Sequence, residues 1–209
     1  MMISLDSNKS FQDNYKILIG AVLPRPIAVI STLNLDGSNN LAPFSFFTAV
    51  SAMPMILAFC PLIRTSTSSK KDTVINIERE KEFVINIGSF EHAALINTCS
   101  EELPYGTDEF KHSGLTALDS HIIKSKRVKE FKIHFECKLR DILSYGETIG
   151  SGRLITGEVV KVHISEDIYE KGKINTQKLA AIGRGAGNDW FKTSEIFELE
   201  RKMKAQIQK

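Results

Sequence analysis

Hydrophobic residues occur along the chain in short runs closed by turn residues, a pattern typical of buried β-strands. The first run covers residues 27–33 and ends at Asn34-Leu35-Asp36-Gly37, where the Asp-Gly pair predicts a hairpin. We expect the return strand over residues 41–50 and a third strand over residues 55–60. The first part of the chain is therefore predicted to be β-structure.

The pattern changes after residue 60, where hydroxyl and cationic side chains replace apolar ones. Ser69 lies three residues before Asp72, which is the spacing of a helix N-cap, and a helix is predicted over residues 73–81. A strand over residues 83–87 follows, and then a second helix that begins at Ser89 and ends near residue 100.

The second half also favours strands. Apolar and polar residues alternate over 133–140, which predicts one buried face and places His134 on the solvent side, and a strand over 154–164 places His163 there too. An apolar stripe predicts a charged C-terminal helix over about 193–208, facing solvent or a second subunit. We expect one domain over residues 1–209, mainly β with helical decorations around a β-barrel.

Composition and charge exclude several classes of protein. The chain has 27 Lys and Arg residues against 25 Asp and Glu residues, and this balance does not suit a nucleic-acid binder. A hydrophobic content of 42% argues against disorder, and the chain has no apolar run long enough for a membrane helix. Without a secretory signal pattern, we expect a cytoplasmic protein.

The cysteines, histidines and carboxylates do not form any of the known patterns of metal-binding or catalytic sites. The three cysteines are far apart, without a CxxC pair, and we expect buried, reduced thiols. The histidines have no metal-ligand spacing, and no catalytic triad or carboxylate pair is evident. We therefore expect no metal site and no catalytic side chain.

Residues 64–73 are the clearest candidate for a ligand site. The start of a helix offers free backbone N–H groups and a positive dipole end, both suited to a phosphate. The segment adds cations and hydroxyl donors, namely Arg64, Lys70, Lys71, Ser66, Ser68, Ser69 and Thr73. The alternative is an ordinary polar loop that ends in an N-cap.

A glycine-rich segment, Gly183–Trp190, contains the only tryptophan. It is not predicted to bind a dinucleotide, because no strand-turn-helix unit and no downstream acidic residue accompany it. The segment either brings Trp190 or Arg184 to a ligand or forms a plain surface turn.

Several segments, taken in order, resemble the flavin reductase-like, FMN-binding split-barrel family, which includes flavoredoxins and short-chain NAD(P)H:flavin oxidoreductases. The resemblance covers about residues 20–190. It is carried by Arg25-Pro26-Ile27, Asp36-Gly37, residues 40–47, Lys71-Asp72-Thr73, residues 83–87, Asp108-Glu109-Phe110, residues 113–116, residues 136–139 and residues 157–160. The glycine-rich segment departs from the family pattern, which has Arg, Leu or Met, two glycines and a tyrosine there.

The resemblance implies an FMN split β-barrel, with the cofactor in a groove at a homodimer interface. Residues matching the family's flavin strand are Asn40, Ala42, Pro43, Phe44, Ser45 and Phe46, with the Ser45 hydroxyl as a donor to the ring. The phosphate is expected at the segment that includes Arg64, Ser66, Lys70, Lys71, Asp72 and Thr73, above all at Lys71 and Thr73.

The function implied is a flavoprotein oxidoreductase that passes a hydride from NAD(P)H through FMN to an unknown second acceptor. In this kind of enzyme the cofactor carries out the chemistry, so a catalytic side chain is not required. Two alternatives are an FMN electron carrier reduced by a protein partner and a flavin-binding module without turnover.

Overall fold

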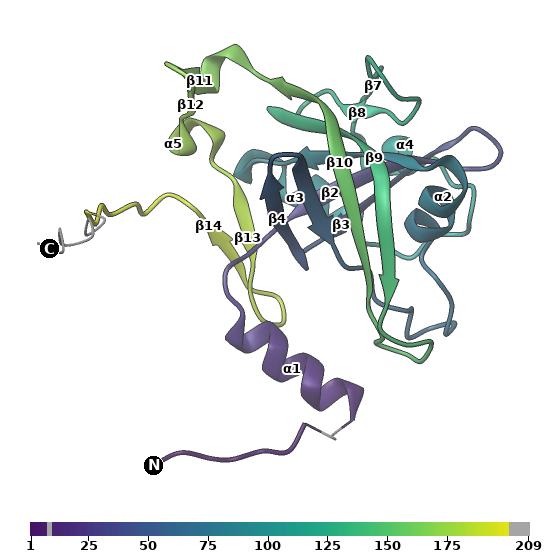
Figure 1. Ribbon diagram of the computed structural model, residues 1–209, viewed down its shortest axis with the longest axis vertical. Helices are drawn as coiled ribbons and strands as arrows, with labels where there is room; N and C mark the ends of the chain where they lie inside the picture. The colour runs from purple at the N-terminus through teal and green to yellow at the C-terminus, as the bar shows by residue number, and fades with distance from the viewer. Residues whose placement is uncertain (8–9, 201–209) are drawn as a thin grey trace, which may run out of the picture.

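The computed structural model describes residues 1–7 and 10–200, and its main feature is a seven-stranded antiparallel sheet (Figure 1). The spatial order of its strands is β3-β2-β6-β9-β10-β5-β4. These strands are β2 (Ala28–Leu33), β3 (Asn39–Phe44), β4 (Phe47–Ala52), β5 (Met55–Phe59), β6 (Glu82–Ile87), β9 (Ile133–Ser144) and β10 (Arg153–Ile164).

Shorter elements surround this sheet. The remaining strands are β1 (Arg25–Pro26), β7 (Ala117–Leu118), β8 (Arg127–Val128), β11 (Tyr169–Glu170), β12 (Lys173–Ile174), β13 (Ile182–Arg184) and β14 (Trp190–Lys192). The helices are α1 (Phe11–Ala21), α2 (Asp72–Glu80), α3 (Ala93–Thr98), α4 (Glu109–Ser113) and α5 (Thr176–Leu179), with 3₁₀ turns η1 (Phe90–His92) and η2 (Glu166–Ile168). The prediction of a mainly β fold with helical decorations is confirmed.

The predicted return strand over residues 41–50 is wrong in one respect, because the chain changes partners at Ser45 and Phe46. Before them Phe44 pairs with Ala28 of β2, and after them Phe47 pairs with Phe59 of β5. The mainly apolar sequence of residues 41–50 does not show such a change of partner. The two edge strands of the large sheet, β3 and β4, are therefore consecutive in the chain.

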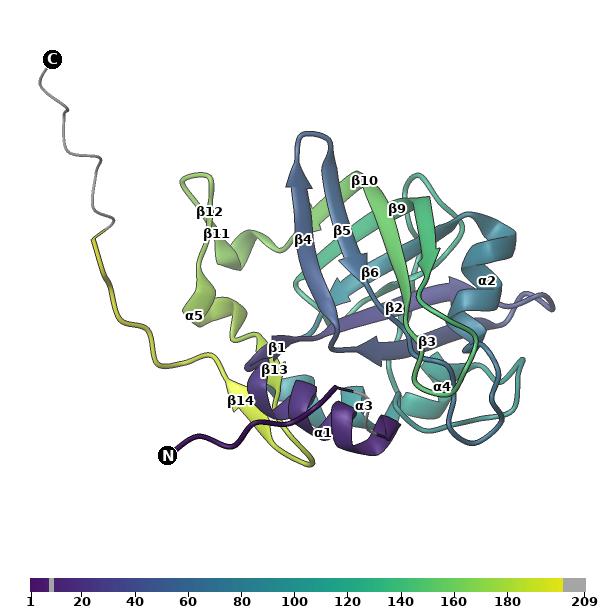
Figure 2. The same cartoon turned by 60° about the horizontal axis from the view of Figure 1, so that its bottom comes forward.

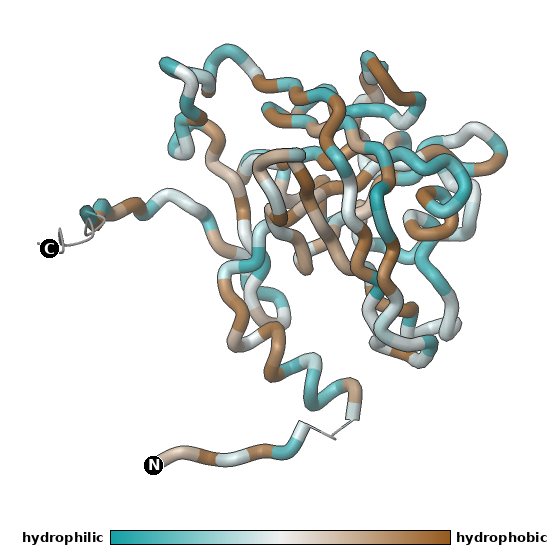
Figure 3. The backbone as a smooth tube through the Cα atoms, in the orientation of Figure 1, coloured by the Kyte–Doolittle hydropathy of each residue, from teal (hydrophilic) through white to brown (hydrophobic). Residues whose placement is uncertain are grey.

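Strand β2 is buried along nearly its whole length because both of its faces are covered, and its polar residues Ser31 and Thr32 are buried as well. Ala28 and Ile30 belong to the cluster inside the curved sheet, together with Phe59. Val29 belongs to a second cluster on the outer side, which includes Leu41 of β3. Figure 3 shows apolar segments among the central strands and also along α1, which lies outside the sheet.

Helices lie on both sides of the β2–β3 hairpin (Figure 2). Helix α2 packs on the inner side, where Val74 and Ile77 join the first cluster, whereas α3 and α4 cover the outer side of β3. The helix predicted over 73–81 is confirmed, but its predicted cap is wrong. The N-cap is Lys71 instead of Ser69, and its side chain caps nothing.

The placement of His134 on a solvent face is also wrong. His134 and Glu136 of β9 are buried, with 5% and 0% of their surface exposed. The backbone N–H groups of residues 121–123 bind the Glu136 carboxylate, so this segment covers the face that the alternation assigned to solvent. The His163 side chain is only 14% exposed and lies 2.6 Å from Glu136.

Three further elements differ from the sequence prediction. Helix α1 was not predicted, and the helix predicted from Ser89 is divided into η1 and α3, without a side-chain cap from Ser89. Residues 193–200 form neither helix nor strand, so the predicted C-terminal helix is wrong there, and its remainder lies outside the described residues. Within the described ranges, no helix is long and apolar enough to cross a membrane.

Candidate functional site

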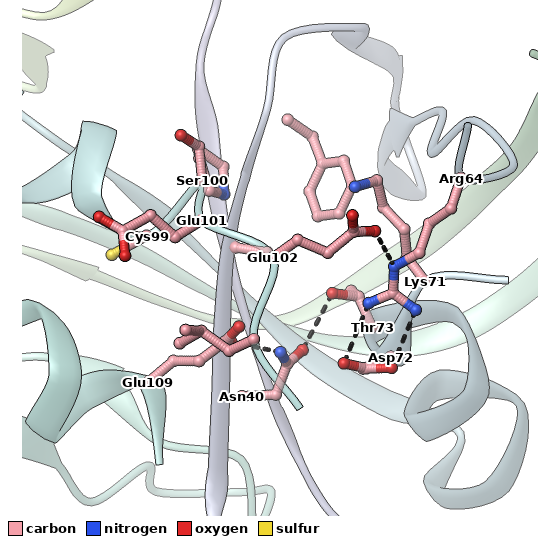
Figure 4. Close-up of a pocket in the computed structure, with 14 residues that line it drawn as sticks. Asn40, Arg64, Lys71, Asp72, Thr73, Cys99, Ser100, Glu101, Glu102 and Glu109 are labelled. Atoms are coloured by element: carbon pink, nitrogen blue, oxygen red, sulfur yellow. Dashed lines mark hydrogen bonds and ion pairs between the residues drawn. The ribbon is translucent and has the colours of Figure 1, made fainter. Parts of the chain in front are cut away.

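A cavity of about 110 Å³ lies where the end of β3, the start of α2 and the segment before α4 meet (Figure 4). Its walls come from parts of the chain that are far apart in sequence. The lining residues are Asn40, Ala42, Pro43, Phe44, Arg64, Lys71, Asp72, Thr73, Cys99, Ser100, Glu101, Glu102, Leu103 and Glu109.

Arg64 ties the loop before α2 to both sides of the cavity. Its Nη1 and Nη2 atoms lie 3.2 and 3.1 Å from the two carboxylate oxygens of Asp72, and Nη1 also donates to the Lys70 carbonyl at 2.9 Å. Its Nε lies 2.8 Å from a carboxylate oxygen of Glu102. The charge of Arg64 is therefore already balanced by carboxylates.

Lys71 is the cation that remains available in the cavity. It forms no hydrogen bond or ion pair with the other residues drawn in Figure 4. Burial lowers the pKa of its ammonium, and the nearby Arg64 lowers it further. The Lys71 side chain does not cap α2, although its carbonyl accepts from the N–H groups of Val74 and Ile75. Among the described residues, the N–H groups of Asp72 and Thr73 at the start of the helix have no acceptor.

A buried hydrogen-bonded chain fixes β3 to the first turn of α2. The Oδ1 atom of Asn40 accepts from the hydroxyls of Thr32 and Thr73, each at 2.9 Å. The Nδ2 atom of Asn40 donates to Glu109, and the backbone N–H of Leu41 donates to the same carboxylate oxygen. The hydroxyl of Thr73 is therefore directed at Asn40.

Glu109 is a buried carboxyl group, only 8% exposed. Its pKa is raised to about 7 because burial disfavours the charged form, and the hydrogen bond from Leu41 offsets part of this effect. Negative charge on Asp72 also raises the pKa of Glu109. The site thus holds a carboxyl group that titrates near neutral pH.

A second cavity of about 120 Å³ adjoins the first and shares Pro43, Phe44 and Ser100 with it. Its other lining residues are Ile27, Ser45, Asn97, Arg184 and Trp190. The two cavities follow β3 from the start of α2 to the β13–β14 hairpin.

The glycine-rich segment forms the β13–β14 hairpin that closes the second cavity. The Arg184 guanidinium lies 5.0 Å from the ring centroid of Trp190, a cation–π distance. A Cβ atom on Gly185 would lie 2.8 Å from the Cβ of Asp189, so the tight turn requires glycine there. Trp190 and Arg184 both line the second cavity, and whether the segment serves a ligand stays a prediction.

Most of the residues predicted for the site come together. Eight line the first cavity, namely Asn40, Ala42, Pro43, Phe44, Arg64, Lys71, Asp72 and Thr73. Ser45 lines the second cavity and accepts a hydrogen bond from Arg25 at 3.3 Å.

The structure does not bring three of the predicted residues to either cavity. Phe46 packs toward Tyr15 of α1, with 6.5 Å between ring centroids. Ser66 lies in an exposed turn, and the Lys70 ammonium binds Glu78 at 2.7 Å on the outer side of α2.

Sequence reasoning missed the contribution of the 99–109 segment. Ser100 and Glu102 lie in the cavity wall because α3 ends there, and the pattern of the sequence did not mark them. Glu109 belongs to the segment Asp108-Glu109-Phe110, which carried part of the family resemblance, and that segment was the available signal in the sequence. In the structure Glu109 is the first residue of α4.

Metal and thiol chemistry receive no support from the geometry. Among the residues that the structure describes, no group of His, Cys, Asp and Glu is arranged to hold a metal ion. Cys99 and Cys137 are buried and unpaired by disulfides, as the sequence predicted, and Cys60 is partly buried. Burial raises the pKa of the Cys99 thiol to about 11, which keeps it protonated.

Comparison with known proteins gives a family match and similar structures. The family model described as the flavin reductase like domain matches residues 20–180. The crystal structure of nitrilotriacetate monooxygenase component B from Bacillus cereus is 34% identical, with a TM-score of 0.90 over 95% of this chain and 99% of that one.

Two structures of lower identity share the fold. One is a Shewanella frigidimarina protein with a split barrel domain, at 17% identity and a TM-score of 0.79 over 93% of this chain and 95% of that one. The other is an FMN-binding protein from Thermus thermophilus, at 16% identity and a TM-score of 0.74 over 95% of this chain and 100% of that one. The predicted split-barrel fold is confirmed.

Proposed function

Because this chain belongs to the flavin reductase-like family, we propose that it binds FMN and passes a hydride from NAD(P)H through the flavin to a second acceptor. The family match supports a flavin-dependent oxidoreductase, and the finer assignment of cofactor and reductant is our proposal. The observation that carries it is the cavity at the start of α2, where none of the residues that line it binds Lys71 through a carboxylate.

The first cavity suits a phosphate group. Lys71 supplies a positive charge in a partly buried place, and the N–H groups of Asp72 and Thr73 at the start of α2 supply backbone donors. Arg64 fixes the loop through Asp72 and Glu102, so in our proposal it shapes the site and Lys71 binds the phosphate. Thr73 acts through Asn40, because its hydroxyl is already donated there.

The second cavity suits a flat ring. Pro43 and Phe44 form one wall along β3, Ser45 offers a hydroxyl, and Trp190 lies at the β13–β14 hairpin. In the proposed complex these residues orient the isoalloxazine ring and exclude water from one of its sides. When bound, FMN would supply the hydride and electron chemistry, and the side chains around it would supply binding and polarity.

The proposal includes a homodimer. Each of the two cavities is smaller than the ~300 Å³ at which typical ligand pockets begin, so a bound FMN would extend beyond either of them. Helix α1 exposes Leu18 by 50%, and Val22 just after it is 57% exposed, beside an apolar cavity that Phe46 and Phe47 also line. Such an apolar surface is typical of an interface, and a second copy would complete the groove.

The test is a titration of the purified protein with FMN, followed by anaerobic addition of NADH or NADPH to the loaded protein. We expect the absorbance of bound FMN to appear on titration and to bleach with at least one of the two nucleotides. Sedimentation of the same sample would show a dimer.

Each outcome decides between the functions considered. Absence of FMN uptake refutes the proposal in both its parts. Uptake without bleaching by either nucleotide refutes the hydride step and favours an electron carrier that a protein partner reduces.

A further inference from the structure

Glu109 stands out in the candidate site as a carboxyl group that forms no ion pair with any of the residues that the structure describes. Only one of its oxygens, Oε2, accepts hydrogen bonds, from Asn40 and from the Leu41 backbone. Among the described residues Oε1 has no hydrogen-bond partner, and Glu109 lines the cavity that Lys71 also lines.

The other charged groups of the cavity are already paired. Arg64 binds Asp72 at 3.1 Å and Glu102 at 2.8 Å, and Glu101 lies 2.9 Å from His112. The cavity therefore contains one cation and one carboxyl group that can still respond to a ligand, Lys71 and Glu109.

An anion that binds next to Lys71 adds negative charge to a cavity that already holds Asp72, Glu101 and Glu102. Like charge disfavours the ionised form of a carboxyl group, and the cost is largest where water is excluded. Glu109 is the first residue of α4, which packs against β3 and α3. The titratable and charged groups near it are the Cys99 thiol just after α3, Asp72 and Arg64. The Glu109 carboxyl group can offset the added negative charge by taking up a proton.

We propose that Glu109 takes up a proton when the phosphate of FMN binds at Lys71, so that the protein binds the anion and the proton together. This inference rests on the proposed function, because it requires FMN in the cavity. Glu109 would be a positioning residue: in its neutral form it still accepts from Asn40 and Leu41, and it keeps β3 and the first turn of α2 in place. Its free pKa of about 7 means that both forms are populated before the ligand arrives.

The experiment is isothermal titration calorimetry with FMN, at about neutral pH, in buffers of different ionisation enthalpy. We expect the wild-type protein to take up a fraction of one proton for each FMN. The variant Glu109→Gln keeps the acceptor oxygen for Asn40 and Leu41 but does not titrate, so its uptake should be lower by that amount. Riboflavin, which lacks the phosphate, should bind the wild-type protein without this uptake.

The affinity gives a second readout. Since the phosphate itself titrates near pH 6, the quantity to compare is the ratio of wild-type to Glu109→Gln affinity for FMN. We expect this ratio to fall by up to about tenfold between about pH 6 and about pH 9, because one unit of pKa shift on binding corresponds to tenfold in affinity. A structural role alone would leave the ratio constant with pH.

The outcomes separate this inference from the proposed function. If FMN binds and the wild-type protein takes up no more protons than the variant, the inference is overturned and the function stands. If FMN does not bind at any pH, the proposed function fails and the inference fails with it. Should Glu109→Gln not fold, the sign of the proton exchange in the wild-type protein decides the question, because the phosphate releases a proton when it binds beside a cation, whereas Glu109 takes one up. Net release or no exchange between about pH 7 and about pH 8 would overturn the inference.

Discussion

Lys71 and Lys70 are adjacent lysines in opposite surroundings, and this makes them a matched pair for testing the phosphate site. Lys71 lines the cavity without a carboxylate bound to it, whereas Lys70 binds Glu78 on the outer side of α2. We predict that Lys71→Met weakens FMN binding strongly and that Lys70→Met changes it less than twofold.

The magnitude follows from the interaction that is lost. A hydrogen bond to a charged group contributes about 1.5–3 kcal/mol, which corresponds to a loss of roughly tenfold to 150-fold in affinity. Stability should not fall in parallel, because burial already lowers the pKa of the Lys71 ammonium and thus opposes its charge. We therefore expect Lys71→Met to be as stable to urea as the wild-type protein, or more stable.

The assay is fluorescence titration with FMN and with riboflavin, together with urea denaturation of each variant. Riboflavin should bind Lys71→Met and the wild-type protein with similar affinity, since it has no phosphate. The reasoning is refuted if Lys71→Met binds FMN within twofold of the wild-type protein, or if riboflavin binding falls as much as FMN binding.

Three further predictions concern the stability of the fold, measured on variants of buried residues. Glu136→Gln should lower the free energy of unfolding by ~3 kcal/mol in urea, because the new amide leaves donors such as the His163 ring and the backbone of 121–123 short of acceptors. Gly157→Ala should cost ~1–3 kcal/mol in the same assay, since its Cβ would lie 2.4 Å from Cζ of Phe83. The pKa of Glu109 is raised from 4.5 to about 7, so the stability that its neutral form contributes is complete below pH 4.5. This stability is lost as the pH rises through about 7, and Glu109→Gln should therefore flatten this part of the profile of melting temperature against pH.

These three predictions have separate controls. Glu158→Gln is the control for Glu136→Gln, because it removes a carboxylate from an exposed ion pair with Arg140. It should lower the free energy of unfolding by less than about 1 kcal/mol, as is typical of surface ion pairs. Gly172→Ala places its Cβ in open space, so any loss there reports backbone strain alone. An unchanged pH profile in Glu109→Gln would contradict the assignment of that titration to Glu109.

The fold could be predicted from the sequence wherever the secondary structure of a segment is determined by residues a few positions away in the chain. The hairpin at Asp36-Gly37 and the helix after Lys71 are examples, because turn residues and apolar spacing act within a few positions. The burial of His134 could not be predicted, since it depends on the 121–123 backbone that binds Glu136 from another part of the chain.

The same distinction holds for the site. Lys71 and Thr73 could be predicted because the start of a helix is a local feature. The direction of the Thr73 hydroxyl, toward Asn40 instead of the cavity, depends on the packing of α2 against β3. The contribution of Glu102 depends on Arg64 in the same way, since only the folded chain brings the two together.

The two edges of the large sheet are joined by Ser45 and Phe46 alone, and this has a consequence for how the protein tolerates changes in chain length. Connections between hairpins commonly accept insertions, because their length does not affect the strands that they join. Here Phe44 ends one edge strand and Phe47 begins the other, so an added residue would separate the edges while both hairpins remained intact. Since Ser45 lines the second cavity, an insertion at this short connection would widen that cavity before it affected the core.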